Sequence, residues 1–162
     1  MGIFTAELIG TALLVLLGNG VVANVVLKNT KGNNSGWIVI TFGWAMAVFI
    51  GVFMASKISG AHLNPAITIA FAYMGKISTD TMAHYLGGQI LGAMTGQLFV
   101  WLSYRQHYLV TDDTASKLAT FSTIPAIRNY GANFITEAIG TFVLVFTVLF
   151  IAAPASSLGA LD

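Results

Sequence analysis

The chain has 162 residues, of which 56% are hydrophobic and only 8% are charged. A soluble domain has about a quarter of its residues charged, so this composition and a mean hydropathy of +0.81 predict an integral membrane protein. With a net charge of +1 there is no basic stripe to neutralise phosphates, and this excludes a nucleic-acid partner. The absence of cysteine excludes disulfides and thiol chemistry.

Four segments have the length and composition of membrane-spanning helices, since about 20 mostly apolar residues cross the hydrocarbon core. They cover about residues 4–27, 37–55, 82–104 and 132–153. A further apolar segment, residues 65–74, is about 15 Å long as a helix and reaches only halfway across. Residues 105–130 form the longest polar connection. We therefore expect four transmembrane helices and one re-entrant half-helix in the lipid bilayer.

Small residues recur at the four-residue spacing that lets helix backbones approach closely in lipid. The third span contains Gly88, Gly92 and Gly96, and the second contains Gly43, Ala47, Gly51 and Ala55. These rows predict close helix packing rather than any chemistry.

An internal repeat relates the first and fourth spans. The sequence AELIGT at Ala6 recurs as TEAIGT at Thr136, with an offset of 130 residues. A repeat whose units each hold three spans must be inverted in the membrane. Residues 1–104 are then the first repeat, with its half-helix at 64–74, and residues 131–162 begin the second. Both belong to a single transmembrane channel domain, 1–162. We expect this domain to be incomplete, because the second repeat is only begun.

Residues 59–68, read as SGAHLNPAIT, carry the strongest functional signal. Asn64 is suited to cap the half-helix with its side-chain oxygen, and Pro65 suits the first helical position. Capping then points the amide NH₂ group of Asn64 toward the bilayer midplane, where the helix dipole adds about half a positive charge. Such a donor site repels cations and protons.

The residues before Asn64 predict an extended backbone. Such backbone is tolerated at membrane depth only when it is buried in protein or lines a wet cavity. Its carbonyl groups form a row of acceptors that leads to the Asn64 donor. This combination favours a neutral, hydroxyl-bearing permeant in single file.

Glu7 and Glu137 are ionisable groups inside predicted spans, where such groups are costly and usually have a partner. For Glu7 we expect the backbone N–H groups near His62. A proton relay in a transporter and an interfacial carboxylate that snorkels to water are the alternatives. Trp44, inside the second span, is a pore residue or a lipid-facing tryptophan. No nucleophile–base pair or metal cluster lies at membrane depth, so we expect neither an enzyme nor a cofactor.

These motifs resemble those of the major intrinsic protein family, the aquaporins and glycerol facilitators. The resemblance covers the whole chain and is strongest at Asn64-Pro65-Ala66. Trp44 stands where the glycerol-conducting branch, the aquaglyceroporins, has its selectivity-filter tryptophan. Residues 121–125, FSTIP, are similar to a loop common in glycerol facilitators. The resemblance implies an all-α, right-handed helical bundle of inverted repeats with six spans and two half-helices.

The resemblance also implies a role for individual residues. The carbonyl groups before Asn64 would line the pore, Trp44 would face the hydrocarbon side of a glycerol-like solute, and Glu7 would brace the re-entrant loop. The implied pore-lining and substrate-binding residues are Leu14, Trp44, Val48, Gly60, Ala61, His62, Leu63, Asn64, Pro65, Ala66 and Leu144, and the implied bracing residues are Glu7 and Glu137.

One departure limits the resemblance. By the offset of the repeat, a second Asn-Pro-Ala falls near position 194, beyond Asp162, and the arginine that completes the filter belongs to that missing half. We therefore expect the N-terminal two-thirds of a channel. The expected function is passive conduction of glycerol, water or other small neutral solutes by a homotetramer in the plasma membrane. The alternatives are an ion-coupled secondary transporter with a broken helix and a nonconducting truncated fragment.

Overall fold

A computed structural model describes residues 1–151 of the protein. The described residues form helices and no strands, as expected from the composition. The helices are α1 (Ile3–Val26), α2 (Trp37–Ser59), α3 (Pro65–Tyr73), α4 (Thr79–Val110), α5 (Thr114–Ala119) and α6 (Tyr130–Phe150). The chain divides into two compact units, Met1–Ala126 and Ile127–Asp162, so α6 is described by itself. The expected end of the fourth span, at residue 153, lies outside the described residues.

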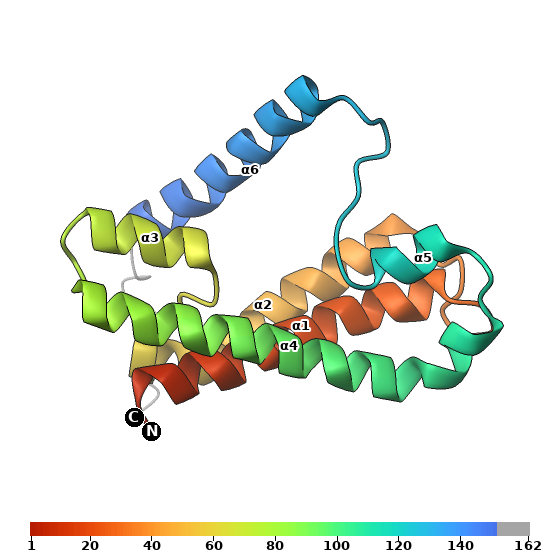
Figure 1. The fold of residues 1–162 in the computed structure, drawn as a ribbon, viewed down its shortest axis with the longest axis horizontal. Coiled ribbons are helices and arrows are strands. Elements are labelled where there is room, and N and C mark those ends of the chain that lie inside the picture. Colours follow the sequence, from red (N-terminus) through yellow and green to blue (C-terminus); the bar gives the residue numbers. More distant parts are fainter. Residues whose placement is uncertain (152–162) are drawn as a thin grey trace, which may run out of the picture. The chain divides into compact units, whose positions relative to one another are not determined.

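Helix α1 is the centre of the first unit and packs against both α2 and α4 (Figure 1). On the α4 side, a Cβ atom added at Gly88, Gly92 or Gly96 would lie less than 3.0 Å from a backbone carbonyl oxygen of α1. Real Cβ atoms do not approach that closely, so the three glycines set the distance between the two helices. This is the close packing that the four-residue spacing predicts.

The contact between α1 and α2 is made through small residues of α2. Ala47 and Ala55 are buried, and a Cβ atom added at Gly51 would lie 2.9 Å from the carbonyl oxygen of Gly10. The opposite face of α2 is apolar and exposed, with Phe42 and Phe53 at 68% and 75% exposure. Such a face suits lipid, because large apolar side chains are left outside a soluble protein only singly.

Three helices of the described residues are long and apolar enough to cross a membrane, namely α1, α2 and α6. Helix α4, expected as a fourth spanning helix, is not among them. It has 32 residues, or about 48 Å of helix, and its mean hydropathy is lowered by polar side chains. Two of these, Gln89 and Gln97, bond to side chains of α1. The expectation that α4 also spans the membrane stays a prediction, and α4 is a long helix with a polar side against α1.

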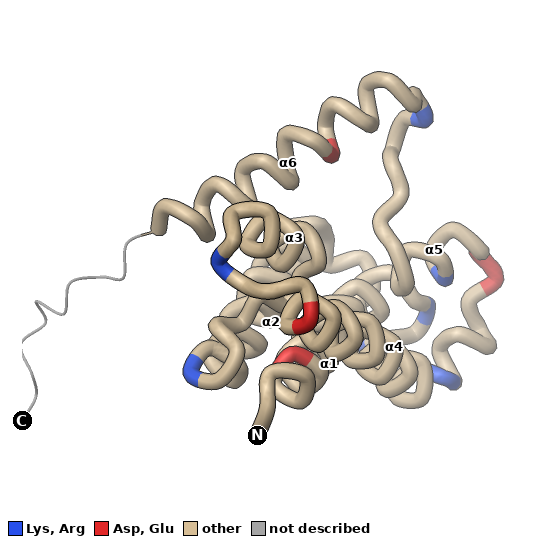
Figure 2. The backbone as a smooth tube through the Cα atoms, turned by 60° about the vertical axis from the view of Figure 1, so that its left-hand side comes forward, with Lys and Arg blue, Asp and Glu red and all other residues tan. Residues whose placement is uncertain are grey.

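Charged residues gather at helix ends and in the connections (Figure 2). Within the interior of the long apolar helices α1 and α6 the only charged residues are Glu7 and Glu137, respectively. The polar connection 105–130 contains the end of α4 and the six-residue helix α5. Asp113 caps α5 by accepting from the backbone N–H groups of Ala115 and Ser116.

Candidate functional site: a re-entrant stretch and half-helix

The half-helix expected from the sequence is α3, which begins at Pro65 and ends at Tyr73. Asn64 is its N-cap, and the Asn64 Oδ1 atom accepts from the backbone N–H of Ala66 at 2.8 Å. Pro65 takes the first helical position, where a missing N–H costs nothing. With Oδ1 engaged in the cap, the Asn64 NH₂ group has no hydrogen-bond partner among the described residues and remains free to donate.

The stretch between α2 and α3 turns back on itself through left-handed backbone. Gly60, Ala61 and Leu63 have φ angles of 79°, 53° and 49°. The left-handed region costs an L-residue about 1–2 kcal/mol, so Ala61 and Leu63 need compensating contacts. Their backbone N–H groups have them, because Ala61 donates to Ser59 Oγ at 3.1 Å and Leu63 donates to Glu7 Oε2 at 2.8 Å.

Glu7 is fully buried and accepts hydrogen bonds at both carboxylate oxygens. Its Oε1 atom accepts from the Ser59 hydroxyl at 2.5 Å and from the His62 backbone N–H at 3.0 Å. Its Oε2 atom accepts from the Leu63 backbone N–H and from the Gln89 side chain, both at 2.8 Å. Four donors suit an ionised carboxylate, which accepts only. Its backbone partners are those expected from the sequence.

Gln89 extends this network to α3. The Gln89 Nε2 atom donates to the Thr68 hydroxyl at 2.9 Å as well as to Glu7. Thr68 also lies 3.0 Å from the His62 Nδ1 atom. One buried polar cluster therefore joins α1, the re-entrant stretch, α3 and α4. Sequence reasoning did not find Gln89 or Thr68, although a glutamine beside Gly88 in an apolar helix is the signal that marks the first.

The His62 side chain is held by two aromatic rings. Its ring centroid lies 4.2 Å from that of Tyr85 and 4.6 Å from that of Phe71. The Tyr85 hydroxyl donates to the carbonyl oxygen of Ser59. His62 thus serves as packing between α3 and α4 while its backbone N–H turns toward Glu7.

The carbonyl groups of residues 60–63 are left without partners. No hydrogen bond among the described residues ends on the carbonyl oxygens of Gly60, Ala61, His62 or Leu63, in contrast to their N–H side, which Glu7 and Ser59 engage. Backbone acceptors at membrane depth need either protein or water. These four carbonyl oxygens are therefore available to a partner outside the described residues.

Trp44 lies in a second part of the same unit. Its ring covers Gly18, where an added Cβ atom would lie 2.5 Å from it. Trp44 lines a cavity of about 860 Å³ whose other walls include Val22 of α1, Ser116 of α5 and Pro125. The FSTIP loop, which is similar to a loop common in glycerol facilitators, thus shares a cavity with Trp44. The contribution of α5 was missed, although Asp113 before Thr-Ala-Ser is a helix N-cap signature.

Of the remaining candidate residues, only Leu14 packs against one of these two groups in the described part of the chain. Leu14 packs half-buried against a cluster that includes Leu63 and Ala55, and Val48 is exposed. Glu137 and Leu144 are exposed on α6, in the second unit. The expected bracing role of Glu137 and the expected pore-wall role of Leu144 therefore stay predictions.

Long apolar helices with small-residue contacts, and a half-length helix capped between two of them, define a helical membrane protein with a re-entrant segment. The chain belongs to the major intrinsic protein family, whose model matches residues 1–160.

Several proteins are similar in sequence to this chain. A probable glycerol uptake facilitator protein of Thermotoga maritima is 54% identical over 153 residues, which cover 94% of this chain and 65% of that protein. The glycerol uptake facilitator protein of Bacillus subtilis is 46% identical over 94% of this chain and 56% of its own length. The chain therefore spans less than two thirds of the length of these relatives.

A solved structure is similar as well. The aquaglyceroporin from Plasmodium falciparum matches with a TM-score of 0.60 at 34% sequence identity. The match covers 66% of this chain and 43% of that one. Over the matched part, the helical arrangement is similar to that of this aquaglyceroporin.

Proposed function

We propose that the chain forms part of a passive transmembrane channel for glycerol, water and other small neutral solutes. The carrying observation is that the carbonyl groups of residues 60–63 and the NH₂ group of the adjacent Asn64 have no hydrogen-bond partner among residues 1–151. A solute with hydroxyl groups can donate to these carbonyl groups and accept from Asn64 in turn. The relatives are named glycerol uptake facilitators, which supports glycerol as one permeant.

The same geometry supports passive passage rather than coupling to protons. All four hydrogen bonds of the Glu7 carboxylate come from donors of the fold itself. A group so committed to structure is a poor carrier of protons in a transport cycle.

The complete pore in this proposal includes a counterpart of Asn64 from the second repeat. The internal repeat between Ala6 and Thr136 supports such a counterpart, with Glu137 in the position of Glu7. Leu14, Leu144 and Val48 would be apolar pore walls, and Trp44 would narrow the mouth. Assembly as a homotetramer in the plasma membrane, with one pore in each protomer, completes the proposal.

The test is solute flux into proteoliposomes. Two preparations are compared, the 162-residue chain and a chimera in which this chain replaces the matching segment of the Thermotoga maritima relative. We expect the chimera to admit glycerol at a rate that an imposed or collapsed proton gradient leaves unchanged. Glycerol flux through the chimera that is no faster than in empty vesicles, or that changes with the proton gradient, would refute the proposal.

A further inference from the structure

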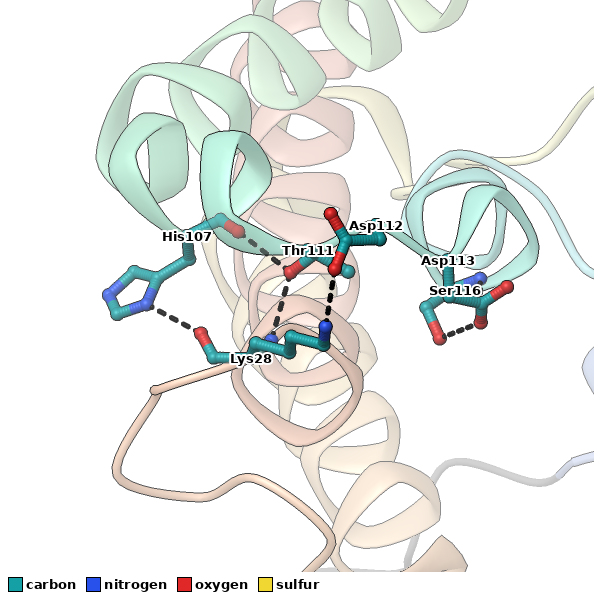
Figure 3. Close-up of polar contacts among 6 residues, drawn as sticks. All are labelled: Lys28, His107, Thr111, Asp112, Asp113 and Ser116. Carbon is teal, nitrogen blue, oxygen red and sulfur yellow. Dashed lines mark hydrogen bonds and ion pairs between the residues drawn. The ribbon is translucent and has the colours of Figure 1, made fainter.

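The segments on both sides of helix α5 are attached to the rest of the unit. At its beginning, Lys28 contacts three residues of α4 and the segment after it, as Figure 3 shows. The Lys28 backbone N–H donates to the Thr111 hydroxyl at 2.9 Å, its carbonyl oxygen lies 3.0 Å from His107 Nδ1, and its ammonium lies 2.6 Å from Asp112. We call Lys28, His107, Thr111 and Asp112 the clasp.

Thr111 is the buried member of the clasp. It is 1% exposed, and its hydroxyl donates to the His107 carbonyl oxygen at 2.7 Å while it accepts from Lys28. Lys28 and Asp112 have side-chain exposures of 52% and 88%, so their ion pair is open to solvent and contributes little. The hydrogen bond between Thr111 and Lys28 is therefore a stronger link between the ends of α1 and α4 than the ion pair is.

The far end of α5 is fixed by a second contact. Thr120, fully buried, is hydrogen-bonded to the Tyr108 hydroxyl of α4. Between the two attachments, Ala119 packs against the cluster of Val22, Val25 and Ile40 on which Trp44 also packs. The position of α5 in the wall of the cavity thus depends on the contacts on both sides of the helix.

We propose that Thr111 is a positioning residue that holds α5 in place as the wall of the cavity opposite Trp44. As a second part of the proposal, the position of α5 sets the width of the opening of this cavity. The second part of this inference rests on the proposed function, because the width matters only if solutes pass there. The first part concerns the position of α5 alone. The experiment therefore has one readout that needs transport and one that does not.

The absence of cysteine from the chain gives a clean reporter of the α5 position. Ala119→Cys places one thiol where α5 meets the apolar cluster. The rate at which this thiol reacts with N-ethylmaleimide is measured on the 162-residue chain in detergent. The chain that carries Ala119→Cys alone is the reference, and every other variant is made in addition to Ala119→Cys. We expect Thr111→Val to raise this rate about fivefold, the change in population that one ordinary hydrogen bond controls.

Two matched variants separate positioning from a general loss of structure. Thr111→Ser keeps the hydroxyl and should restore the reference rate. Thr114→Val makes the same change at an exposed position of α5 and should leave the rate unchanged. If Thr111→Val does not give a monodisperse protein, Thr111→Ala removes the same bond with a smaller side chain. A rate equal to the reference in a folded Thr111 variant lacking the hydroxyl would overturn the inference.

The transport readout is the ratio of erythritol flux to glycerol flux in the chimera described above. A wider mouth should raise this ratio in Thr111→Val, since erythritol is the larger polyol, and Thr111→Ser should return it to the parent value. Faster labelling with an unchanged ratio would overturn the link between α5 and passage. Absence of glycerol flux in the parent would instead refute the proposed function, and the labelling rates would still decide the role of Thr111.

Discussion

The backbone N–H of Leu63 donates to the carboxylate of Glu7 at 2.8 Å, across 56 positions of sequence. The side chain of Leu63 meanwhile occupies the space above Gly10 and Gly51, where an added Cβ atom would lie 2.6 Å and 3.0 Å from its methyl groups. Main chain and side chain of one residue are thus both fitted to α1 and α2. Since Leu63 directly precedes Asn64, these contacts determine where the cap of α3 lies.

Glu7→Gln should destabilise the protein although it preserves the side-chain shape. A glutamine accepts at one atom only, so its NH₂ group must face two of the donors that Glu7 now binds. We expect the free energy of unfolding to fall by about 2–4 kcal/mol, since buried donors lose charge-assisted bonds. The measurement is the denaturation midpoint in detergent micelles. Asp80→Asn, the same change at an exposed acid in the first turn of α4, is the control, and equal shifts in both variants would contradict this account.

Gly92→Ala should weaken the contact between α1 and α4. The added Cβ atom would collide with the backbone of Leu8, and relief of such overpacking costs about 1–3 kcal/mol. Gly20→Ala in α1 is the control, because nothing lies within 4 Å of its added Cβ atom. Gly20→Ala should be neutral or stabilising, since alanine is the better helix former. The two unfolding midpoints are compared, and a lower value for Gly20→Ala than for Gly92→Ala would show that close packing does not determine the distance between these helices.

Much of this arrangement could be predicted from local sequence signals. The cap at Asn64, the start of α3 at Pro65 and the small-residue rows all depend on neighbours within a few positions, and the family resemblance was confirmed. The partners of Glu7 among backbone groups followed from the rule that a buried charge needs donors.

What escaped prediction depends on contacts between distant segments. The polar side of α4 is recognisable only when Gln89 and Gln97 are seen to bond with α1, since hydropathy treats them as defects in a span. Helix α5 has six residues, too few for a periodic pattern, and the residues that flank it bond to the distant Lys28 and to Tyr108. The roles of Glu137 and Leu144 remain predictions, because α6 forms its own unit.

Asn64→Asp should separate capping from solute binding. Aspartate caps helices as well as asparagine does, so α3 should keep its start and the unfolding midpoint should change little. The donor NH₂ group is replaced by a second acceptor oxygen, so the proposed pore loses its central donor. We expect glycerol flux in the chimera to fall at least about tenfold, given the cost of leaving solute and site unmatched. Unchanged flux with an intact fold would remove Asn64 from the pathway.

Trp44→Ala should change the selectivity of the proposed channel. Removing the indole enlarges the cavity of about 860 Å³ on the side where Trp44 covers Gly18. We expect a changed ratio of glycerol to water permeability, measured by light scattering of proteoliposomes in stopped flow. Trp101→Ala, at an exposed tryptophan of α4, is the matched control. A ratio that stays at the parent value in both variants would place Trp44 outside the filter.

The pH dependence of the ion pair between Lys28 and Asp112 follows from the Asp112 carboxyl. The hydrogen bond and the positive charge of the Lys28 ammonium lower the pKa of the Asp112 carboxyl below its usual 3.8. A lowered pKa means that the ion pair contributes fully above the ordinary aspartate range and is lost as pH falls through the lowered value. The contact should therefore persist unchanged between pH 5 and pH 8. Titration of ¹³C-labelled aspartate carboxyls by NMR measures this directly.

Two substitutions distinguish the sources of the shift in this titration. Lys28→Met should return the Asp112 pKa toward its usual value. Ser116→Ala should mainly raise the pKa of Asp113, which the Ser116 hydroxyl and the backbone N–H groups of α5 hold below its usual value. An Asp112 midpoint that is the same with and without Lys28 would mean that the ion pair does not form in solution. The attachment of α5 to the end of α1 would then depend on Thr111 and His107 alone.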